Sequence, residues 1–281
     1  MPAAYLPERR FLRTSGQEAE SFLQNLITTD VASLPLSEAR GGALLTPQGK
    51  ILFDFLIWRE ADGFFIETES SQLEALSRRL TMYKLRSAVE IETTPDEGAT
   101  VFWGEQAARE GAADARFGQA GIPVIRVRGQ AGAESFDGDY NALRVEAGVA
   151  ASGADYALQD AFPHDVLMDI NGSLSFRKGC YVGQEVVSRM QHRSTARRRL
   201  VQISAETDLP ATGTEITAEG KAVGTLGTVC GRSGLAIVRT DRIGSAMSAG
   251  IPVLAGDVAV TVALPAWSGL SFPSSEEEAG P

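Results

Sequence analysis

The most informative segment of this chain reads Lys178-Gly179-Cys180-Tyr181-Val182-Gly183-Gln184-Glu185-Val186-Val187. Its cysteine follows a glycine, has no second cysteine nearby and comes shortly after two cations, Arg177 and Lys178. Apolar residues at helical spacing predict a short helix that begins near Gly183. Cationic neighbours and a helix N-terminus both favour the thiolate form of a cysteine. The segment therefore predicts a functional thiol at Cys180.

Both cysteines of the chain are expected to be free thiols. Two cysteines among 281 residues do not make a disulfide framework. The second, Cys230, lies between Val229 and Gly231, and we expect it to be a small buried apolar residue.

Histidine is scarce in this sequence. The chain has only His164 and His192, and a zinc site with four nitrogen or sulfur ligands would require nearly all of its histidines and cysteines. No metal site is therefore predicted. A cysteine hydrolase, in which one of these histidines activates Cys180, remains an alternative.

The charge of the chain is strongly acidic overall and basic in one segment. A net charge of −10 argues against nucleic-acid binding, because a phosphate backbone must be met by a basic face. Residues 177–199 nevertheless carry seven cationic side chains and one carboxylate. This segment is either a solvated arginine-rich face or a site for a small polyanion.

No stretch of the sequence is suited to a membrane. No window reaches the roughly 18 uninterrupted apolar residues that a spanning helix needs, and residues 1–10 lack the apolar core of a secretory signal. We therefore expect a soluble, cytoplasmic protein without a membrane partner.

The first third of the chain predicts a mixed structure. Ser15-Gly16-Gln17-Glu18 has capping-box spacing before a helical apolar pattern. The turn Thr46-Pro47-Gln48-Gly49 predicts a hairpin over residues 42–58. Its second strand, residues 51–58, is apolar on both faces and predicts a buried central strand. Asp54 stands in the middle of that strand and requires a partner there.

Further along, strands and helices continue to mix, which indicates the α+β class. A strand at residues 64–68 precedes a helix opened by Ser71-Gln72-Leu73-Glu74, and a weak strand is expected at 124–127. Asn171-Gly172 predicts a second hairpin. From Leu200 onward, short alternating stretches predict a small antiparallel β-barrel.

Arg144 and Glu146 flank Val145, and alternation on a strand would put both on one face. One interpretation is a surface salt bridge. The other is a carboxylate at Glu146 that faces a cavity and accepts hydrogen bonds from the adjacent N–H donors of an aminopyrimidine ring.

The segment around Cys180 resembles the signature of the YgfZ family, which belongs to the glycine-cleavage T-protein superfamily. Segments elsewhere resemble the same family, and together they span most of the chain: residues 22–31, 44–52, 83–87 and 143–148.

This resemblance implies a three-domain ring around a central cavity, with a C-terminal antiparallel β-barrel. The corresponding boundaries are 1–48 plus 140–195 for a first α+β domain, 49–139 for a second, 196–267 for the barrel and 268–281 for a disordered tail.

The resemblance also implies tetrahydrofolate binding and a role in assembling or repairing iron–sulfur clusters of client proteins. Cys180 would be the functional thiol. The residues expected to bind the cofactor are Glu146, Arg144, Asp54, Lys178, Gly179, Tyr181, Gln184 and Arg189.

One departure from the superfamily bears on a folate-dependent aminomethyltransferase or demethylase as an alternative function. In the T-protein a catalytic aspartate follows a strand that resembles residues 64–68, and by alignment this chain offers either Glu74 or no carboxylate at that position. Glu74 already suits a capping box, so aminomethyl transfer is disfavoured. The T-protein also lacks a cysteine equivalent to Cys180, which marks the YgfZ branch.

Overall fold

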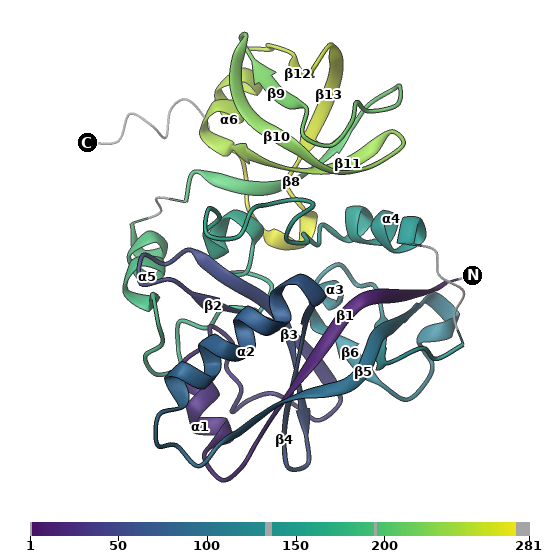
Figure 1. The fold of residues 1–281 in the computed structure, drawn as a ribbon. Helices are drawn as coiled ribbons and strands as arrows, with labels where there is room; N and C mark the ends of the chain where they lie inside the picture. The colour runs from purple at the N-terminus through teal and green to yellow at the C-terminus, as the bar shows by residue number, and fades with distance from the viewer. Residues whose placement is uncertain (1, 133–136, 194–195, 274–281) are drawn as a thin grey trace. The chain divides into compact units, whose positions relative to one another are not determined.

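A computed structural model describes residues 2–132, 137–193 and 196–273 of this chain (Figure 1). It contains two compact units. The first runs up to Tyr140 and includes Met168–Ser188, and the second comprises Asn141–Leu167 and the chain from Arg189 onward. Most of the predicted tail, from residue 274, lies outside the described residues.

The predicted N-terminal hairpin is confirmed. Strands β2 (Glu38–Leu45) and β3 (Ile51–Glu60) pair antiparallel, and the amide of Gly49 donates to the carbonyl of Thr46 at 2.9 Å in the turn. Leu56 and Ile57 are both fully buried, in two different apolar clusters. The second strand is therefore buried on both faces, as its composition predicted.

Seven strands of the first unit close into a barrel in the order β1-β4-β3-β2-β6-β7-β5. The pairing is antiparallel except between β2 and β6. The remaining strands are β1 (Ala3–Ser15), β4 (Gly63–Glu69), β5 (Glu90–Trp103), β6 (Ala112–Asp114) and β7 (Val124–Arg128). The strands predicted at 64–68 and 124–127 are thus confirmed.

Helices α1 (Ala19–Gln24) and α2 (Ser70–Lys84) pack on this barrel. Leu23, Leu76 and Leu80 belong to one buried cluster with strand residues. Neither predicted capping box forms, because the residues before the helices are Glu18 and Glu69 and neither side chain caps its helix. Short helical segments η1 (Gly104–Ala107) and α3 (Ala115–Gly118) lie between the later strands.

Charged side chains are buried within the first unit. Arg126 pairs with Glu67 and, at 3.3 Å, with Asp114, while Arg9 Nε donates to Glu67 at 2.8 Å. Burial by itself raises the pKa of Glu67, but the guanidinium groups of Arg126 and Arg9 outweigh it and hold that pKa below its ordinary value.

The hairpin predicted at Asn171-Gly172 is wrong. The amide of Ser173 donates to the side chain of Asn171 at 3.1 Å, and the amide of Ser175 donates to the carbonyl of Thr28 at 3.0 Å. The amide of Leu174 still donates to the carbonyl of Met168 across the turn at 3.0 Å, but neither flank is a strand and no ladder forms between them.

The second unit contains the predicted C-terminal barrel, closed in the order β10-β11-β8-β13-β12-β9. The four predicted stretches are confirmed, and β10, β12 and α6 add to them. The elements are β8 (Arg198–Ser204), β9 (Glu215–Ala218), β10 (Lys221–Cys230), β11 (Ser233–Arg239), α6 (Thr240–Ser248), β12 (Val253–Ala255), β13 (Val258–Ala263) and η3 (Ala266–Ser268).

Helices α4 (Asp137–Ala147) and α5 (Gln184–His192) each contain a boundary between the units, and η2 (Pro163–Val166) lies in the second unit. Among the described residues, none of the helices has the length and apolar character needed to span a bilayer.

Candidate functional site

Cys180 is exposed in an irregular loop four residues before α5. The helix begins at Gln184, whose amide donates to the carbonyl of Tyr181 at 3.2 Å. The predicted helix after Cys180 is therefore confirmed, and the thiol is accessible to a partner or reagent.

Two glycines allow the start of α5 to lie against the β2–β3 turn. Gly183 has φ +78°, and a Cβ at this position would lie 2.5 Å from the carbonyl oxygen of Thr46. On the turn, a Cβ at Gly49 would lie 2.9 Å from the Cβ of Val186. Any side chain at either glycine would push the two elements apart, so this contact fixes the position of the Cys180 loop.

Lys178 attaches the same loop to the end of α1 and the segment after it. Its ammonium donates to the carbonyls of Gln24, Ile27 and Thr29, the last two at 2.6 and 3.0 Å. Burial lowers the pKa of Lys178 to about 8, and the nearby carboxylate of Asp30 opposes part of that decrease. The ammonium therefore attaches the loop to these backbone carbonyls, and its predicted contact with a cofactor stays a prediction.

The other signature residues differ in their exposure. Tyr181 is 6% exposed, and its ring lies 5.1 Å from the Lys178 ammonium. Burial raises the pKa of its hydroxyl, which has no hydrogen-bond partner in the described part of the chain. Gly179 is exposed, with open space where a Cβ would project. Gln184 is half-buried, and Arg189 is exposed on α5.

Asp54 has the partner that its central position requires. Gln72 Nε2 donates to its carboxylate at 3.0 Å, and Thr68 donates to its carbonyl at 3.1 Å. The carboxylate is half-buried in β3 and lies in the same unit as Cys180.

Arg144 and Glu146 lie on helix α4, so the prediction of a strand is wrong for this segment. On the helix, Arg144 is buried: its guanidinium donates to Asp155 and Thr228, both at 2.8 Å, and to the carbonyl of Val149 at 3.0 Å. Glu146 is exposed instead. The two side chains thus differ in environment, which strand alternation would not produce.

Glu146 lines a pocket of about 490 Å³ in the second unit. Its carboxylate has no partner among the described residues. Gln202, which donates to the carbonyl of Glu146 at 2.8 Å, lines the same pocket, as do Ser204 and Ser233. The volume is in the range of small-molecule sites. A free carboxylate beside polar groups fits the adjacent N–H donors of a pterin ring.

Cys230 lines this pocket too and is only partly buried, which differs from the buried apolar residue expected. Burial raises the pKa of its thiol, while Arg144 acts in the opposite direction. Sequence reasoning missed its place because β10, which ends at Cys230, was not predicted.

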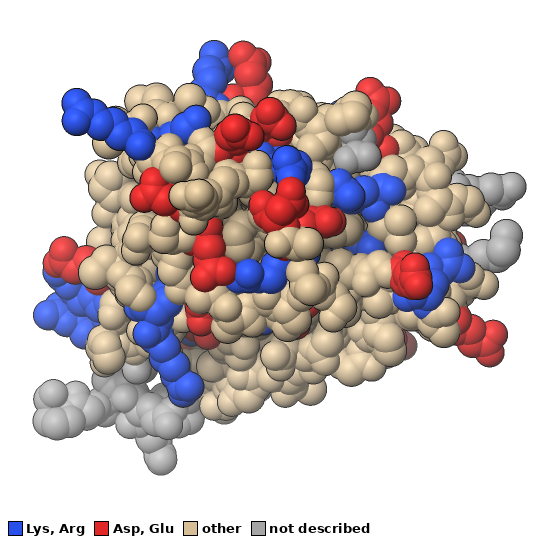
Figure 2. Space-filling model, turned by 90° about the horizontal axis from the view of Figure 1, so that it is seen from below, with Lys and Arg blue, Asp and Glu red and all other residues tan. Residues whose placement is uncertain are grey.

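Some of the cationic side chains of residues 177–199 already have partners within the protein. Arg198 pairs with Asp160 at 3.4 Å, and Arg199 donates to the carbonyl of His164 at 2.8 Å. Figure 2 shows acidic and basic side chains interspersed over one face of the molecule, without a continuous basic surface there. That face therefore offers no extended basic site for a polyanion.

The histidines show no arrangement for a cysteine hydrolase. His164 is fully buried, with its Nε2 3.2 Å from Gln191. His192 ends α5, eight residues after its first residue, which corresponds to about 12 Å along the helix axis. No cluster of potential metal ligands occurs in residues 2–132, 137–193 and 196–273.

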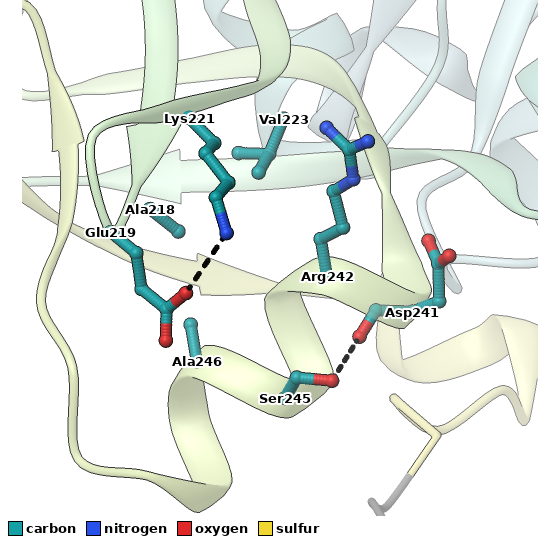
Figure 3. A pocket seen from close by; sticks show the side chains of 8 residues that line it. All are labelled: Ala218, Glu219, Lys221, Val223, Asp241, Arg242, Ser245 and Ala246. Atoms are coloured by element: carbon teal, nitrogen blue, oxygen red, sulfur yellow. Dashed lines mark hydrogen bonds and ion pairs between the residues drawn. The ribbon is translucent and has the colours of Figure 1, made fainter. Parts of the chain in front are cut away.

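A smaller pocket of about 230 Å³ lies beside α6, with charged side chains on its walls (Figure 3). Lys221 and Glu219 point toward each other and form an ion pair at 3.7 Å, while Ser245 donates to the carbonyl of Asp241 at 3.0 Å. Arg242 donates to the carbonyl of Ala222. Since these charged and polar groups already have partners within the protein, we do not consider this pocket a candidate site.

Comparisons with known proteins support the coarser part of the resemblance, which is the similarity to iron–sulfur cluster assembly factors and to the T-protein fold. Residues 197–270 match the family model described as CAF17, C-terminal beta-barrel domain. The chain is 29% identical over 286 residues to a Mus musculus protein named iron–sulfur cluster assembly factor IBA57, mitochondrial, which covers 85% of this chain and 77% of the relative. A homologue from Pyricularia oryzae is 31% identical over 219 residues. That match covers 70% of this chain and 55% of the relative's length.

The fold is similar to that of the glycine cleavage system aminomethyltransferase T from Bartonella henselae, with a TM-score of 0.72. The similarity covers 96% of this chain and 87% of that protein, at 16% sequence identity. The T-protein-like fold with a C-terminal β-barrel is therefore confirmed.

The predicted cytoplasmic localisation is contradicted by these comparisons. The relatives from Pyricularia oryzae, Mus musculus and Homo sapiens are named as mitochondrial proteins, which points to mitochondria. The prediction rested on the lack of membrane and secretory segments, and this property does not distinguish one aqueous compartment from another.

Proposed function

We propose that this chain is an iron–sulfur cluster assembly factor of the T-protein superfamily. Two observations support this function: the relatives that carry this name match along most of the chain, and the fold is that of a T-protein. Its partners would be the assembly or client proteins that give or receive the cluster. The more specific YgfZ resemblance and the three-domain ring around a central cavity remain part of the proposal.

The exposed thiol of Cys180 is the group that we assign to this work. The assignment rests on the accessibility of this cysteine and on its fixed loop. Lys178 attaches the loop to backbone carbonyls near the end of α1, and the close approach at Gly183 places the start of α5 against the β2–β3 turn. A cysteine binds iron as the thiolate, so its proton is released to solvent when the sulfur contacts a cluster. The cluster is cargo here, and the loop presents one ligand to it.

Tetrahydrofolate is the cofactor that we propose for the pocket at Glu146. When bound, it would supply a carrier for one-carbon groups. The free carboxylate of Glu146 would accept hydrogen bonds from the pterin, and Gln202 orients the end of α4 by donating to the carbonyls of Val145 and Glu146. Arg144 would support this helix from its buried network and not by contact with the cofactor.

The proposal does not extend to aminomethyl transfer. Glu74, the carboxylate that the family resemblance matches to the superfamily's catalytic aspartate, has an 83% exposed side chain and pairs with Arg78 at 3.4 Å. A carboxylate so open to solvent lacks the buried environment of a tuned catalytic acid or base.

One experiment tests both parts of the proposal. Cells that lack their own homologue are supplied with wild type, Cys180→Ala, Cys230→Ala or Glu146→Gln, and the activities of cluster-dependent enzymes are measured. We expect Cys180→Ala to restore less than a tenth of the wild-type activity at unchanged melting temperature. Cys230→Ala, the matched thiol control, should restore most of it. Full rescue by Cys180→Ala would exclude the thiol.

The same purified proteins are titrated with tetrahydrofolate by calorimetry. We expect Glu146→Gln to weaken binding about tenfold, which corresponds to roughly 1.4 kcal/mol, because it removes a charge-assisted hydrogen bond. Cys180→Ala should bind like wild type. Equal affinity of wild type and Glu146→Gln would place the folate site elsewhere.

A further inference from the structure

The C-terminal end of α2 exposes an unusual concentration of apolar side chains. Leu85 is 87% exposed, Met82 67% and Tyr83 38%. These are three of the five large apolar side chains that the described part of the chain exposes. They lie within four residues of one another, and Tyr83 and Leu85 fall in the stretch 83–87 that the family resemblance includes.

Leu85 also has a backbone conformation that is costly for leucine. The amide of Ser87 donates to the carbonyl of Lys84 at 2.8 Å and closes a four-residue turn. Leu85 occupies its second position with φ 47° and ψ −107°, close to a type II′ turn, in which glycine is favoured. The chain therefore places a bulky apolar residue in a strained turn where it gains almost no burial.

The turn is fixed on its other side. The carboxylate of Glu18 accepts the amide of Ala88 at 2.6 Å, and the amide of Glu18 donates to the carbonyl of Ala88 at 3.3 Å. A Cβ at Gly16 would lie 2.4 Å from the same carbonyl oxygen. This close contact holds the turn against the start of α1, so Leu85 is presented by a rigid support.

The charge of this segment is mostly basic, although Arg78 pairs with Glu74 at 3.4 Å and Glu18 lies in the wall of the adjacent groove. Residues 75–89 contain four cations, Arg78, Arg79, Lys84 and Arg86, and no carboxylate, in a chain whose net charge is −10. Lys84 and Arg86 have no side-chain partner among the described residues. An open groove of about 670 Å³ is lined by Glu18, Leu85, Arg86 and Ser87.

We propose that Met82, Tyr83, Lys84, Leu85 and Arg86, here called the Leu85 surface, bind an acidic segment of a partner protein. An apolar side chain of that segment packs on Leu85 in the groove, and its carboxylates pair with Lys84 and Arg86. This inference goes beyond the proposed function and does not depend on the Cys180 thiol.

Two other occupants fit the surface less well. A second copy of the chain packed symmetrically on this surface would bring Lys84 and Arg86 close to their own equivalents. An anionic bilayer would meet the Glu18 carboxylate in the groove wall as well as the cations. A protein segment can place its carboxylates and its apolar side chain separately, so the observations favour it.

The test uses the full chain and three fluorescein-labelled 12-residue peptides with a central Leu-x-x-Leu. In the first peptide four glutamates flank the leucines, in the second four lysines replace the glutamates, and in the third serines replace the leucines. Fluorescence anisotropy measures binding. We expect saturable binding of the first peptide, at least tenfold tighter than that of the other two and weakened by added salt.

Variants locate the contact. Leu85→Gly removes the side chain but suits the turn, so we expect affinity to fall at least tenfold while the melting temperature stays equal or rises. Arg86→Glu should also lower affinity at least tenfold. Leu36→Ser, which removes another exposed leucine (65% exposed), is the matched control and should leave binding unchanged.

Several outcomes would overturn the proposal. They are the absence of saturable binding to the acidic peptide, equal binding of the acidic and basic peptides, and undiminished binding by Leu85→Gly. Sedimentation with phosphatidylglycerol vesicles and analytical ultracentrifugation complete the test. Vesicle binding or dimerisation that depends on Leu85, in place of peptide binding, would show that the occupant is a membrane or a second copy.

Discussion

Lys178 shows how one side chain holds the functional loop. Cationic charge next to Cys180 predicted an electrostatic effect on the thiol, but the ammonium is bound by three backbone carbonyls from residues 24–29. Those acceptors are about 150 positions away in the sequence, so composition around Cys180 contains no sign of them. The exposed thiol and the helix start, by contrast, depend on neighbouring residues and were predicted.

The burial of Lys178 gives stability a pH dependence. Because its pKa is lowered from 10.5 to about 8 in the folded chain, the unfolded chain holds more protons between these values. The free energy of unfolding therefore rises with pH across that window. We expect a rise of about 1 kcal/mol between pH 8 and 9.5 in wild type, discounted because the side chain is only half-buried.

Urea denaturation of wild type and Lys178→Met at pH 7, 8, 9 and 9.5 checks this expectation. The variant has no amine to titrate, so its stability should lack that increment. The series ends at 9.5 because the raised pKa of Tyr181 acts in the opposite direction above about pH 10, where an unfolded tyrosine ionises. Parallel pH profiles of the two proteins would show that the ammonium is not buried as described.

Among the elements, α5 and the β2–β3 hairpin were predicted and α4 was not. The hairpin has a local turn signal, and α5 has a clear apolar face. In α4, Tyr140, Leu143, Arg144 and Ala147 are all buried at helical spacing. Arg144 interrupts the apolar pattern of this helix, because a charged residue is not counted as part of an apolar face. Its burial depends on Asp155 and Thr228, which the local sequence does not reveal.

The contact between α5 and the hairpin predicts a difference between two glycines. Gly183→Ala combines a positive φ with a Cβ 2.5 Å from the carbonyl oxygen of Thr46, whereas Gly172→Ala has φ +83° and open space around its Cβ. We expect a loss of about 1 kcal/mol for Gly172→Ala from strain alone, and about 2–4 kcal/mol for Gly183→Ala.

Chemical denaturation of both variants measures this difference. Reaction of Cys180 with a thiol reagent gives a second readout, because displacement of α5 should change its rate in Gly183→Ala and leave it unchanged in Gly172→Ala. Equal losses of stability would mean that the two elements separate without cost, and the contact would then not fix the loop.

At the scale of the whole molecule, each unit has its own apolar core and its own buried ion pair. The first unit buries Glu67 with Arg126, and the second buries Asp155 with Arg144. Removing the carboxylate of such a pair leaves a buried guanidinium with less compensating charge, which costs up to about 3–5 kcal/mol. Arg126 keeps Asp114 as a partner at 3.3 Å, so we expect the smaller loss in the first unit. The T-protein-like architecture was expected from a family resemblance. Composition and periodicity alone predicted only an α+β region followed by a barrel. The buried ion pairs join segments that are far apart in the sequence, so no local pattern reveals them.

Separate cores and separate ion pairs lead us to expect two transitions in scanning calorimetry. Glu67→Gln should lower the midpoint of one transition and Asp155→Asn that of the other, and the double variant should show both shifts additively, since the two pairs share no residue. Glu74→Gln, which breaks the exposed pair with Arg78, is the control and should change stability by less than about 0.5 kcal/mol. If both buried-pair variants lowered one shared transition by similar amounts, the two barrels would unfold together, and the stability of the Cys180 loop would then depend on the second unit as much as on its own.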